Sequence, residues 1–392
     1  MPSGPAGSLK LLLVVHSINV RGGMEVQLAH LAAGLAAAGH EVRLVSISST
    51  EDPSERLKGP DMDPRVQIVH LGARTRWAKV AALRRLARLA RSSDIVHCTG
   101  WDASLWGRLA AIAARRPAIM AEHTPGRAHQ WSSGGAPRKR LIAAHNRALD
   151  PFTAATVICA EWHRELMRSE GVAARKTILI PNGVPVAELR RRAGANPTRA
   201  DLGIPGSAKV IAHVARFVAQ KRQDFALETT ARLRETLGDV RVVFAGAGPE
   251  LERVRALADE RGADWAVFLG RHENPAGIFG LADLAVLPSA GEALPMAVLE
   301  AIAVGTPMVA TDVGDVGTVL EDTGAGLVVP PDDPEAFYRA CHDVLSDAAL
   351  RERLQVAALS AGPDLDADTM VERYERVFAA VLTPNGSEPL RV

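Results

Sequence analysis

The sequence predicts an α/β protein with two doubly wound parallel sheets, one in each of two domains. Short apolar runs, mostly rich in β-branched residues, alternate with amphipathic helical patterns along nearly the whole chain. This alternation stops at a polar connector, residues 186–205, and then begins again. A length of 392 residues also suits two domains better than one. Two such sheets joined by one linker should form a cleft between the carboxyl ends of their strands, where these folds bind ligands.

The first domain is expected over residues 1–186. Its first strand is predicted at Leu11–Val15, because this apolar run is shorter than the core of a signal peptide and no small-residue cleavage site follows it. The remaining strands are predicted at Val42–Ser46, Val66–His70, Ile95–Cys98, Ala118–Ala121, Thr156–Cys159 and Thr177–Ile180. Amphipathic helices are expected between several of them, for example over residues 25–38 and 78–91.

The second domain is expected over residues 187–366. Its strands are predicted at Val210–Val214, Val240–Phe244, Trp265–Phe268, Leu284–Leu287, Met308–Ala310 and Gly326–Val329. A last helix, over about residues 367–382, precedes a polar tail.

Composition excludes several classes of protein. The hydrophobic fraction of 47% is typical of a globular chain with a large core, and no run approaches the 18 apolar residues of a membrane span. Three cysteines, far apart in the chain, indicate neither a disulfide framework nor a zinc site. These features favour a cytoplasmic protein, and abundant Ala and Arg with little Lys favours a bacterial source.

The net charge of +1 hides an uneven distribution. Residues 1–190 hold 26 Lys and Arg against 15 Asp and Glu, whereas residues 191–392 hold 20 against 30. The excess is concentrated in residues 74–91, where Val80, Leu83, Ala87 and Ala90 share one helical face. A solvated helix packed on a sheet explains this pattern, and so does peripheral contact with the inner face of a membrane; both interpretations stay open.

Three groups of residues carry chemistry. Gly22 and Gly23 follow the first strand and open a helix, where free N–H groups suit a phosphate, although such a glycine turn is common. Arg216 and Lys221 follow the strand at Val210–Val214, and two cations in such a loop can neutralise a diphosphate leaving group. Glu300 lies in an apolar helical run, where a carboxylate should either be exposed at the helix end or accept hydrogen bonds from hydroxyls.

These residues, taken with others in the same order, resemble glycosyltransferase family 4, the retaining enzymes with the GT-B fold. The matching residues and motifs are Gly22-Gly23, His123, Pro181-Asn182-Gly183-Val184, Arg216 and Lys221, Gly246-Ala-Gly248-Pro249, and Glu292-x7-Glu300-Ala-x-Ala-x-Gly-Thr-Pro. The resemblance covers nearly the whole chain, and residues 288–311 are its most specific part.

The resemblance implies two Rossmann-like domains and a role for each matching residue. Gly22 and Gly23 would lie against the donor, as would Gly246 and Gly248, and His123 would contact the transferred sugar. Arg216 and Lys221 would bind the diphosphate.

The two glutamates would divide the donor between them. Glu300 would hold the ribose, and Glu292 would hold the sugar hydroxyls with backbone support from Leu294, Pro295 and Met296. The helix at 367–392 would complete the first domain.

The segment after Glu292 departs from the family pattern. The family commonly shows Gly-Phe-Gly there, whereas this chain has Ala293-Leu294-Pro295. Proline has no N–H, so one backbone contact to the donor is lost, which bears on the choice of sugar.

No cofactor and no metal are expected. In the family, retention is usually assigned to front-face displacement, in which the leaving phosphate helps to deprotonate the acceptor hydroxyl. Asp61-Met62-Asp63 and Asp364-Leu365-Asp366 match the short pattern of metal-dependent transferases, but both lie in proline-flanked loop sequence and are not expected to bind metal.

The predicted function is therefore transfer of a hexosyl group from a nucleotide-diphosphate sugar, with UDP favoured, to an acceptor hydroxyl. The acceptor stays open among a glycan, a lipid-linked sugar, a sugar phosphate and a small metabolite, and no nucleic acid is expected. Two alternatives remain on the same fold: a nucleotide-sugar epimerase or phosphorylase, and a silent subunit that binds nucleotide sugar without turnover.

Overall fold

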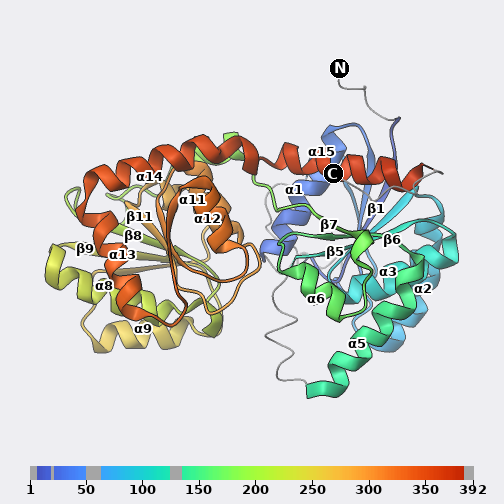
Figure 1. The fold of residues 1–392 in the computed structure, drawn as a ribbon, viewed down its shortest axis with the longest axis horizontal. Helices are drawn as coiled ribbons and strands as arrows, with labels where there is room; N and C mark the ends of the chain where they lie inside the picture. Colours follow the sequence, from blue (N-terminus) through green and yellow to red (C-terminus); the bar gives the residue numbers. More distant parts are fainter. Residues whose placement is uncertain (1–6, 19–21, 50–62, 124–134, 384–392) are drawn as a thin grey trace. The chain divides into compact units, whose positions relative to one another are not determined.

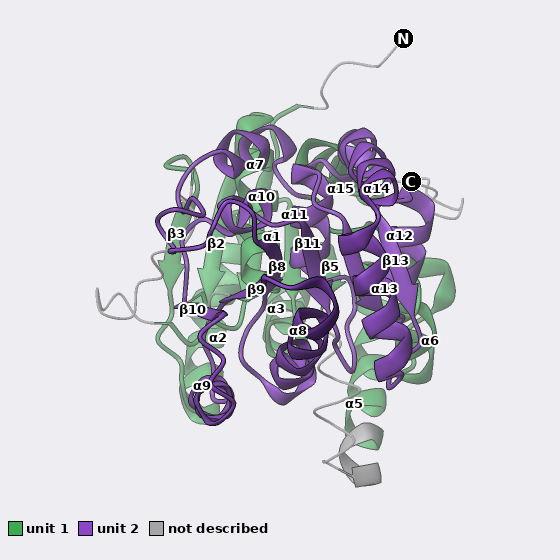
Figure 2. Cartoon of the chain, turned by 90° about the vertical axis from the view of Figure 1, so that its left-hand side faces the viewer, with its two compact units in different colours: residues 1–183, 367–392 green, residues 184–366 purple. Residues whose placement is uncertain are grey.

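The structure is a computed structural model, and it describes residues 7–18, 22–49, 63–123 and 135–383. The chain forms two compact units, one of residues 1–183 and 367–392 and the other of residues 184–366, shown in separate colours in Figure 2. The first unit thus includes the C-terminal helix. The boundary between the units falls between Gly183 and Val184, whereas the sequence predicted it after residue 186.

Unit 1 is built on a seven-stranded parallel sheet with the order β3-β2-β1-β4-β5-β6-β7. Figure 1 labels β1, β5, β6 and β7 of this sheet. Its strands are β1 Lys10–Val15, β2 Glu41–Ser46, β3 Gln67–His70, β4 Ile95–Thr99, β5 Ala118–Glu122, β6 Thr153–Ile158 and β7 Thr177–Leu179. Its α-helices are α1 Gly23–Ala37, α2 Arg76–Arg91, α3 Trp101–Ala114, α5 Gly135–Leu149, α6 His163–Ser169 and α15 Ala367–Leu382.

Helices cover both faces of this sheet, which is why its strands read as continuous apolar runs. Alternate residues of β1 enter different cores: Leu11 and Leu13 join the core that includes α1 and α15, while Leu12 and Val14 join the core that includes α2 and α3. The expectation that helix 367–382 belongs with the first domain is consistent with this packing, since Val371 and Tyr374 of α15 are buried in the first of these cores.

Unit 2 repeats the arrangement with six parallel strands in the order β10-β9-β8-β11-β12-β13. The strands are β8 Lys209–Val214, β9 Val240–Ala245, β10 Ala266–Gly270, β11 Leu284–Leu287, β12 Met308–Thr311 and β13 Gly326–Val329. The α-helices are α7 Val186–Ala193, α8 Gln223–Leu237, α9 Leu251–Glu260, α10 Pro275–Gly280, α11 Met296–Val304, α12 Val316–Thr323, α13 Pro334–Ser346 and α14 Ala348–Ala361. The short 3₁₀ helices among the described residues are η1 Asp150–Phe152, η2 Ala174–Lys176, η3 Ala219–Lys221 and η4 Gly362–Leu365.

The strand orders place one topological switch point in each sheet. Connections run in opposite directions from β1 and β4 in unit 1, and from β8 and β11 in unit 2. At such a point the loops that leave the carboxyl ends of two neighbouring strands diverge, and the crevice between them is where doubly wound sheets bind ligands. The loops after β1 and β4, and those after β8 and β11, are therefore the places to look for a site.

Residues 186–205, expected as a connector, are instead an integral part of unit 2. Val186 and Leu189 bury the apolar side of α7. Arg190 Nε donates to the carbonyl oxygen of Ala303 at 2.8 Å, and Arg199 Nη2 binds Asp283 Oδ2 at 2.9 Å. The arginines that made this segment look like a linker are thus the groups that attach it to the sheet and its helices.

One further expectation is corrected in part. Ala87 and Ala90 of the expected α2 face are buried and Leu83 packs against the same core, but Val80 is exposed and Leu86 is buried in addition. Residues 124–134 lie outside the described part of the chain, and residues 135–149 form α5.

Candidate active site

The loop after β8 carries both predicted phosphate-binding cations. Arg216 is exposed, and its backbone oxygen accepts a hydrogen bond from Gln223 Nε2 at 2.8 Å. Lys221 lies at the end of η3 and forms an ion pair with Glu292, which comes from the loop after β11. Both side chains are largely buried, with exposed fractions of 14% and 6%. The two loops of the unit 2 switch point therefore meet in a charged pair.

Backbone contacts fix these two loops against each other. Ala290 N donates to the carbonyl oxygen of Gln220 at 2.8 Å, and Gln220 Nε2 donates back to the carbonyl oxygen of Gly291. Thr311 at the end of β12 donates to the carbonyl oxygen of Ser289 at 2.6 Å. Both partners of the ion pair lie on loops that these hydrogen bonds connect. The positions of the two side chains are therefore fixed before a ligand binds, so the pair is preorganised.

Gly246 and Gly248 have a structural reason to be glycine. A Cβ on Gly246 would lie 1.9 Å from the backbone oxygen of Ala215, and one on Gly248 would lie 2.2 Å from that of Phe217. Phe217 N also donates to the carbonyl oxygen of Ala247 at 3.0 Å. The loop after β9 thus packs directly on the loop that carries Arg216, and the expected contact of these glycines with the donor stays a prediction.

The segment that contains Glu292 is held from the other side by Gly314. This glycine has φ +60°, a left-handed conformation, and a Cβ there would lie 2.5 Å from the backbone oxygen of Glu292. Leu294 and Met296 are buried, and Pro295 is the N-cap of α11, with its carbonyl oxygen accepting from Val298 N at 3.1 Å. Pro295, which stands where the family commonly has the second glycine, is thus accommodated because it directly precedes helix α11.

Glu300 lies within α11 and is partly buried. Burial raises its pKa to about 7, although the nearby charge of Arg192 lowers it. Its carboxylate makes no hydrogen bond or ion pair within the described part of the chain. A carboxylate removed from water without a donor is unfavourable, so it is suited to a ligand that brings hydroxyl groups.

In unit 1, His123 follows β5 and its Nδ1 donates to Asn182 Oδ1 at 3.0 Å. Burial lowers the pKa of His123, against the opposing effects of the Asn182 hydrogen bond and the Glu122 charge. The imidazole is therefore neutral at neutral pH and leaves Nε2 to accept a hydrogen bond. The sequence singled out Asn182 only as part of a motif, and its role in orienting His123 emerges from the structure.

The glycine pair begins α1 as expected, but one of its N–H groups is engaged. Gly22 is the N-cap, and its N–H donates to Glu25 Oε2 at 3.0 Å. Gly23 is exposed at the first helical position. The N–H of Gly22 could bind a phosphate only if its hydrogen bond to the Glu25 carboxylate were broken or shared. Gly23 is therefore better placed than Gly22 to donate its N–H to a phosphate.

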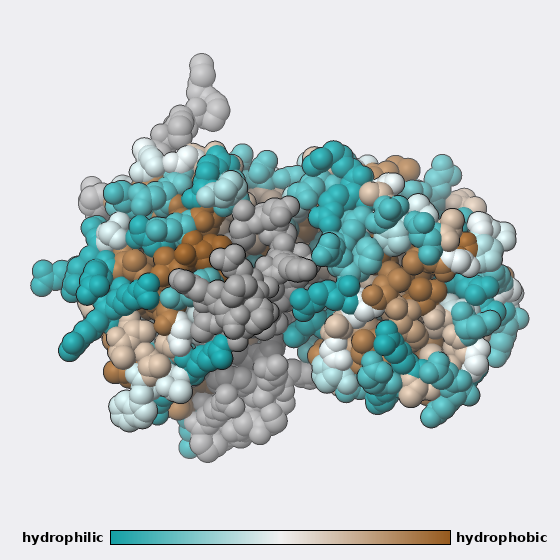
Figure 3. All heavy atoms as spheres, turned by 180° about the vertical axis from the view of Figure 1, so that it is seen from behind, coloured by the Kyte–Doolittle hydropathy of each residue, from teal (hydrophilic) through white to brown (hydrophobic). Residues whose placement is uncertain are grey.

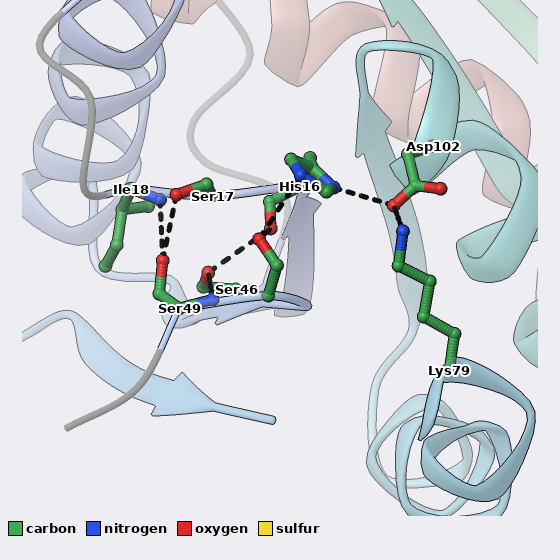
Figure 4. Close-up of polar contacts among 8 residues, drawn as sticks. His16, Ser17, Ile18, Ser46, Ser49, Lys79 and Asp102 are labelled. Atoms are coloured by element: carbon green, nitrogen blue, oxygen red, sulfur yellow. Dashed lines mark hydrogen bonds and ion pairs between the residues drawn. The ribbon is translucent and has the colours of Figure 1, made fainter. Parts of the chain in front are cut away.

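Sequence reasoning missed a second cluster in unit 1, drawn in Figure 4. Asp102 Oδ2 accepts hydrogen bonds from His16 Nδ1 and from Lys79 Nζ, both at 2.7 Å. Ser48 Oγ lies 3.3 Å from His16 Nε2. The positions of two residues in the sequence could have indicated this cluster. His16 directly follows β1, and Asp102 lies in the first turn of the helix after β4.

Two negative findings apply to the described residues alone. Among them, no group of three or more His, Cys, Asp and Glu side chains could hold a metal ion. In the first of the two short aspartate motifs, Asp61 is outside the described residues. Asp63 forms an ion pair with Arg65, which lowers the pKa of the Asp63 carboxyl to about 2. None of the described helices is long and apolar enough to cross a membrane. On the face drawn in Figure 3, hydrophobic residues gather in patches that hydrophilic residues border.

Family models match both halves of the chain. The model for glycosyltransferase family 4 matches residues 21–188, and the model for glycosyl transferases group 1 matches residues 195–360. A D-inositol 3-phosphate glycosyltransferase of Kineococcus radiotolerans is 29% identical, over 94% of this chain and 93% of its own. A 2-deoxystreptamine N-acetyl-D-glucosaminyltransferase of Streptomyces fradiae is 29% identical, over 93% of this chain and 92% of its own.

Solved structures share the fold. HepE of Anabaena, in complex with UDP and glucose, matches with a TM-score of 0.79 at 17% identity, over 95% of this chain and 99% of its own. A glycosyltransferase of Rickettsia africae matches with a TM-score of 0.80 at 16% identity, over 97% of this chain and 100% of its own. The chain therefore belongs to glycosyltransferase family 4: it is a hexosyltransferase with the GT-B fold.

Proposed function

We propose that this enzyme transfers a hexosyl group from a nucleotide-diphosphate sugar, with UDP as the favoured nucleotide, to an acceptor hydroxyl, with retention of anomeric configuration and without a metal ion. The observation that carries the proposal is the preorganised Lys221–Glu292 pair at the unit 2 switch point, with Glu300 in the helix that follows. The relatives named above act on cyclitols, which supports a small polyhydroxylated acceptor.

Donor binding assigns one part of the nucleotide sugar to each group. Arg216 and Lys221 neutralise the diphosphate, so the exposed guanidinium of Arg216 closes over it while Lys221 stays anchored to Glu292. Glu292 accepts hydrogen bonds from sugar hydroxyls, and Glu300 accepts them from the ribose. These hydroxyl donors replace the water that burial has taken from Glu300, which favours its ionised form.

The chemical step needs no enzyme nucleophile. The bond between the anomeric carbon and the β-phosphate oxygen breaks, the acceptor oxygen bonds to the same face of that carbon, and the acceptor proton passes to the leaving phosphate. Arg216 and Lys221 stabilise the charge that develops on the diphosphate, in place of a metal ion. His123, neutral and oriented by Asn182, accepts a hydrogen bond through Nε2 from a hydroxyl of the transferred sugar.

We also propose that the enzyme works in the bacterial cytoplasm, with peripheral contact at the membrane. Both named relatives come from bacteria, and all three cysteines are free and buried. Trp77 and Val80 of α2 are exposed, with fractions of 82% and 48%, on a helix whose Arg84, Arg85 and Arg88 are also exposed. Exposed apolar and basic side chains together favour an anionic lipid surface.

The test is product analysis with purified enzyme, a panel of nucleotide sugars and a panel of cyclitol acceptors. An α-linked product from an α-linked donor, formed equally well with and without EDTA, is the expected result. Glu300→Ala and Lys221→Ala should each lower kcat/KM about 100-fold or more. Retention is contradicted by a β-linked product, and metal independence by loss of activity with EDTA. Near-normal turnover in both variants contradicts the roles of Glu300 and Lys221. Isomerisation of the donor without acceptor would indicate an epimerase.

A further inference from the structure

The switch point of unit 1 carries its own set of polar side chains, which the proposed donor chemistry does not use. Gly100, with φ +80°, makes the turn between β4 and α3 and sets Asp102 in the first turn of that helix. His16 follows β1, the strand beside β4. Lys79 reaches the same carboxylate from α2 (Figure 4). Three elements thus converge where a doubly wound sheet binds its ligand.

The charges in this cluster are already matched. Lys79 and Asp102 are both largely buried, with exposed fractions of 14% and 16%, whereas His16 is about half exposed. Burial alone would raise the pKa of Asp102, but the hydrogen bonds from His16 and Lys79 outweigh it and hold the pKa below its ordinary value. The carboxylate is therefore ionised, and it neutralises the single lysine of the cluster.

One carboxylate oxygen remains for a ligand. Both hydrogen bonds go to Oδ2 of Asp102, and Oδ1 accepts none from the described residues. Ser48 Oγ and His16 Nε2 stand beside each other at 3.3 Å. The site therefore offers hydrogen-bond acceptors and a hydroxyl, which suit hydroxyl or amino groups of a ligand.

The other cations of α2 do not pair with this carboxylate. Arg76, Arg84, Arg85, Arg88 and Arg91 are all exposed, and the ion pairs of Asp102 with described residues go to Lys79 and His16. Lys79, the lysine of the described cluster, is paired with Asp102, so a phosphate that entered would lie beside the Asp102 carboxylate, and like charges at close range repel.

We propose that the His16–Asp102–Lys79 cluster is the acceptor site, and that it takes an unphosphorylated polyol or aminocyclitol and rejects a phosphorylated one. Asp102 Oδ1 accepts a hydrogen bond from an acceptor hydroxyl or ammonium group, and Lys79 serves to position the carboxylate rather than to bind an anion. This inference rests on the proposed function, because it names the acceptor class of that reaction.

The experiment is calorimetric titration of the full-length enzyme, saturated with UDP so that the donor site is closed to anions. 2-Deoxystreptamine, myo-inositol and D-myo-inositol 3-phosphate are titrated in turn. The wild-type enzyme should bind at least one of the first two about tenfold or more tightly than the phosphate ester, in keeping with the cost of one unfavourable charge contact. Stronger binding of the phosphate ester, or no binding of any of the three, overturns the inference.

Asp102→Asn supplies the sharper test. Asparagine preserves the shape but releases Lys79, so affinity for the unphosphorylated ligands should fall while affinity for the phosphate ester rises, and the preference should invert. Adding Lys79→Met to this variant should abolish the gained phosphate binding. Arg84→Met, at an exposed position of α2, is the matched control and should change neither affinity. An unchanged preference in Asp102→Asn contradicts the inference.

Failure of the inference and failure of the proposed function are separable. UDP is titrated first, and a protein that binds no UDP and consumes no nucleotide sugar contradicts the proposed function. A protein that binds UDP normally, yet prefers the phosphorylated cyclitol, contradicts the acceptor assignment alone. Asp102→Asn lies in unit 1 and should leave UDP affinity at the unit 2 site unchanged, and thermal unfolding of the variant reports whether unit 1 is still folded.

Discussion

At the residue scale, the candidate site combines carboxylates in two different environments. Glu292 forms an ion pair with Lys221 of its own unit, whereas burial desolvates Glu300 and the charge of Arg192 offsets this only in part. The ion pair fixes the position of the Glu292 carboxylate before a ligand binds. The Glu300 carboxylate instead needs hydrogen-bond donors that a ligand supplies. These environments lead to separate predictions for stability.

Glu300→Gln should stabilise the protein at alkaline pH. The folded-state pKa of about 7 lies above the ordinary glutamate value of 4.5, so ionisation of Glu300 favours the unfolded state as pH rises between these values. Relative to the variant, the wild type should lose about 1–3 kcal/mol between pH 5 and pH 8 and should match it below pH 5. Thermal unfolding of both proteins across this range is the measurement, and parallel pH profiles would refute the account of Glu300.

Lys221 and Glu292 should be strongly coupled in stability. Removing either partner leaves a buried charge without compensation, so Lys221→Met and Glu292→Gln should each cost about 3–5 kcal/mol. The double variant should cost clearly less than the sum, because neither charge remains. Urea unfolding of the four proteins gives the coupling energy, and strictly additive losses would mean that the ion pair does not form in solution.

At the element scale, glycines allow loops and helices to approach closely in both units. Gly246→Ala should displace the loop of residues 215–217, because its Cβ has no room beside the backbone oxygen of Ala215. We expect the melting temperature to fall and UDP affinity to drop with it. Gly206→Ala, where nothing lies within 4 Å, is the matched control and should leave both unchanged. Equal behaviour of the two variants would show that the loops are not packed in this way.

The packing of α15 on α1 gives a reciprocal prediction. A Cβ on Gly34 would lie 2.4 Å from Cγ2 of Val371, so Gly34→Ala should overpack this contact by about 1–3 kcal/mol. Val371→Ala makes the missing space, and the double variant should regain part of the loss. Thermal unfolding measures this rescue. Independent, additive effects of the two substitutions would place α15 elsewhere.

Much of the fold follows from the sequence, because β-branched runs and helical periodicity are local signals. The strands of both sheets and the last helix lie at or near their expected places. The segment at 186–205 could not be assigned in the same way, since its arginines bind carbonyl oxygens about 80 to 170 residues away, as Arg190 does with Ala303 and Leu359. Asp102 was missed for the same reason: its partners His16 and Lys79 come from other elements.

At the scale of the whole molecule, one topological rule accounts for both clusters. Each unit reverses its strand order once, between β1 and β4 or between β8 and β11, and each reversal carries a buried lysine paired with a carboxylate. In unit 2 we assign the pair to the donor diphosphate and sugar, and in unit 1 to the acceptor. The sequence indicated the first through family motifs and gave no comparable motif for the second.

The most direct test of the central claim, that the unit 2 switch point binds the nucleotide diphosphate, is UDP titration against two lysine variants. Lys221 lies in the loop after β8, and Lys209 begins the same strand at its opposite, amino end. Lys221→Met should weaken UDP binding about 100-fold, in keeping with loss of one buried charge contact to a phosphate, while Lys209→Met should leave it unchanged. Equal UDP affinity in the wild type and both variants would contradict the account.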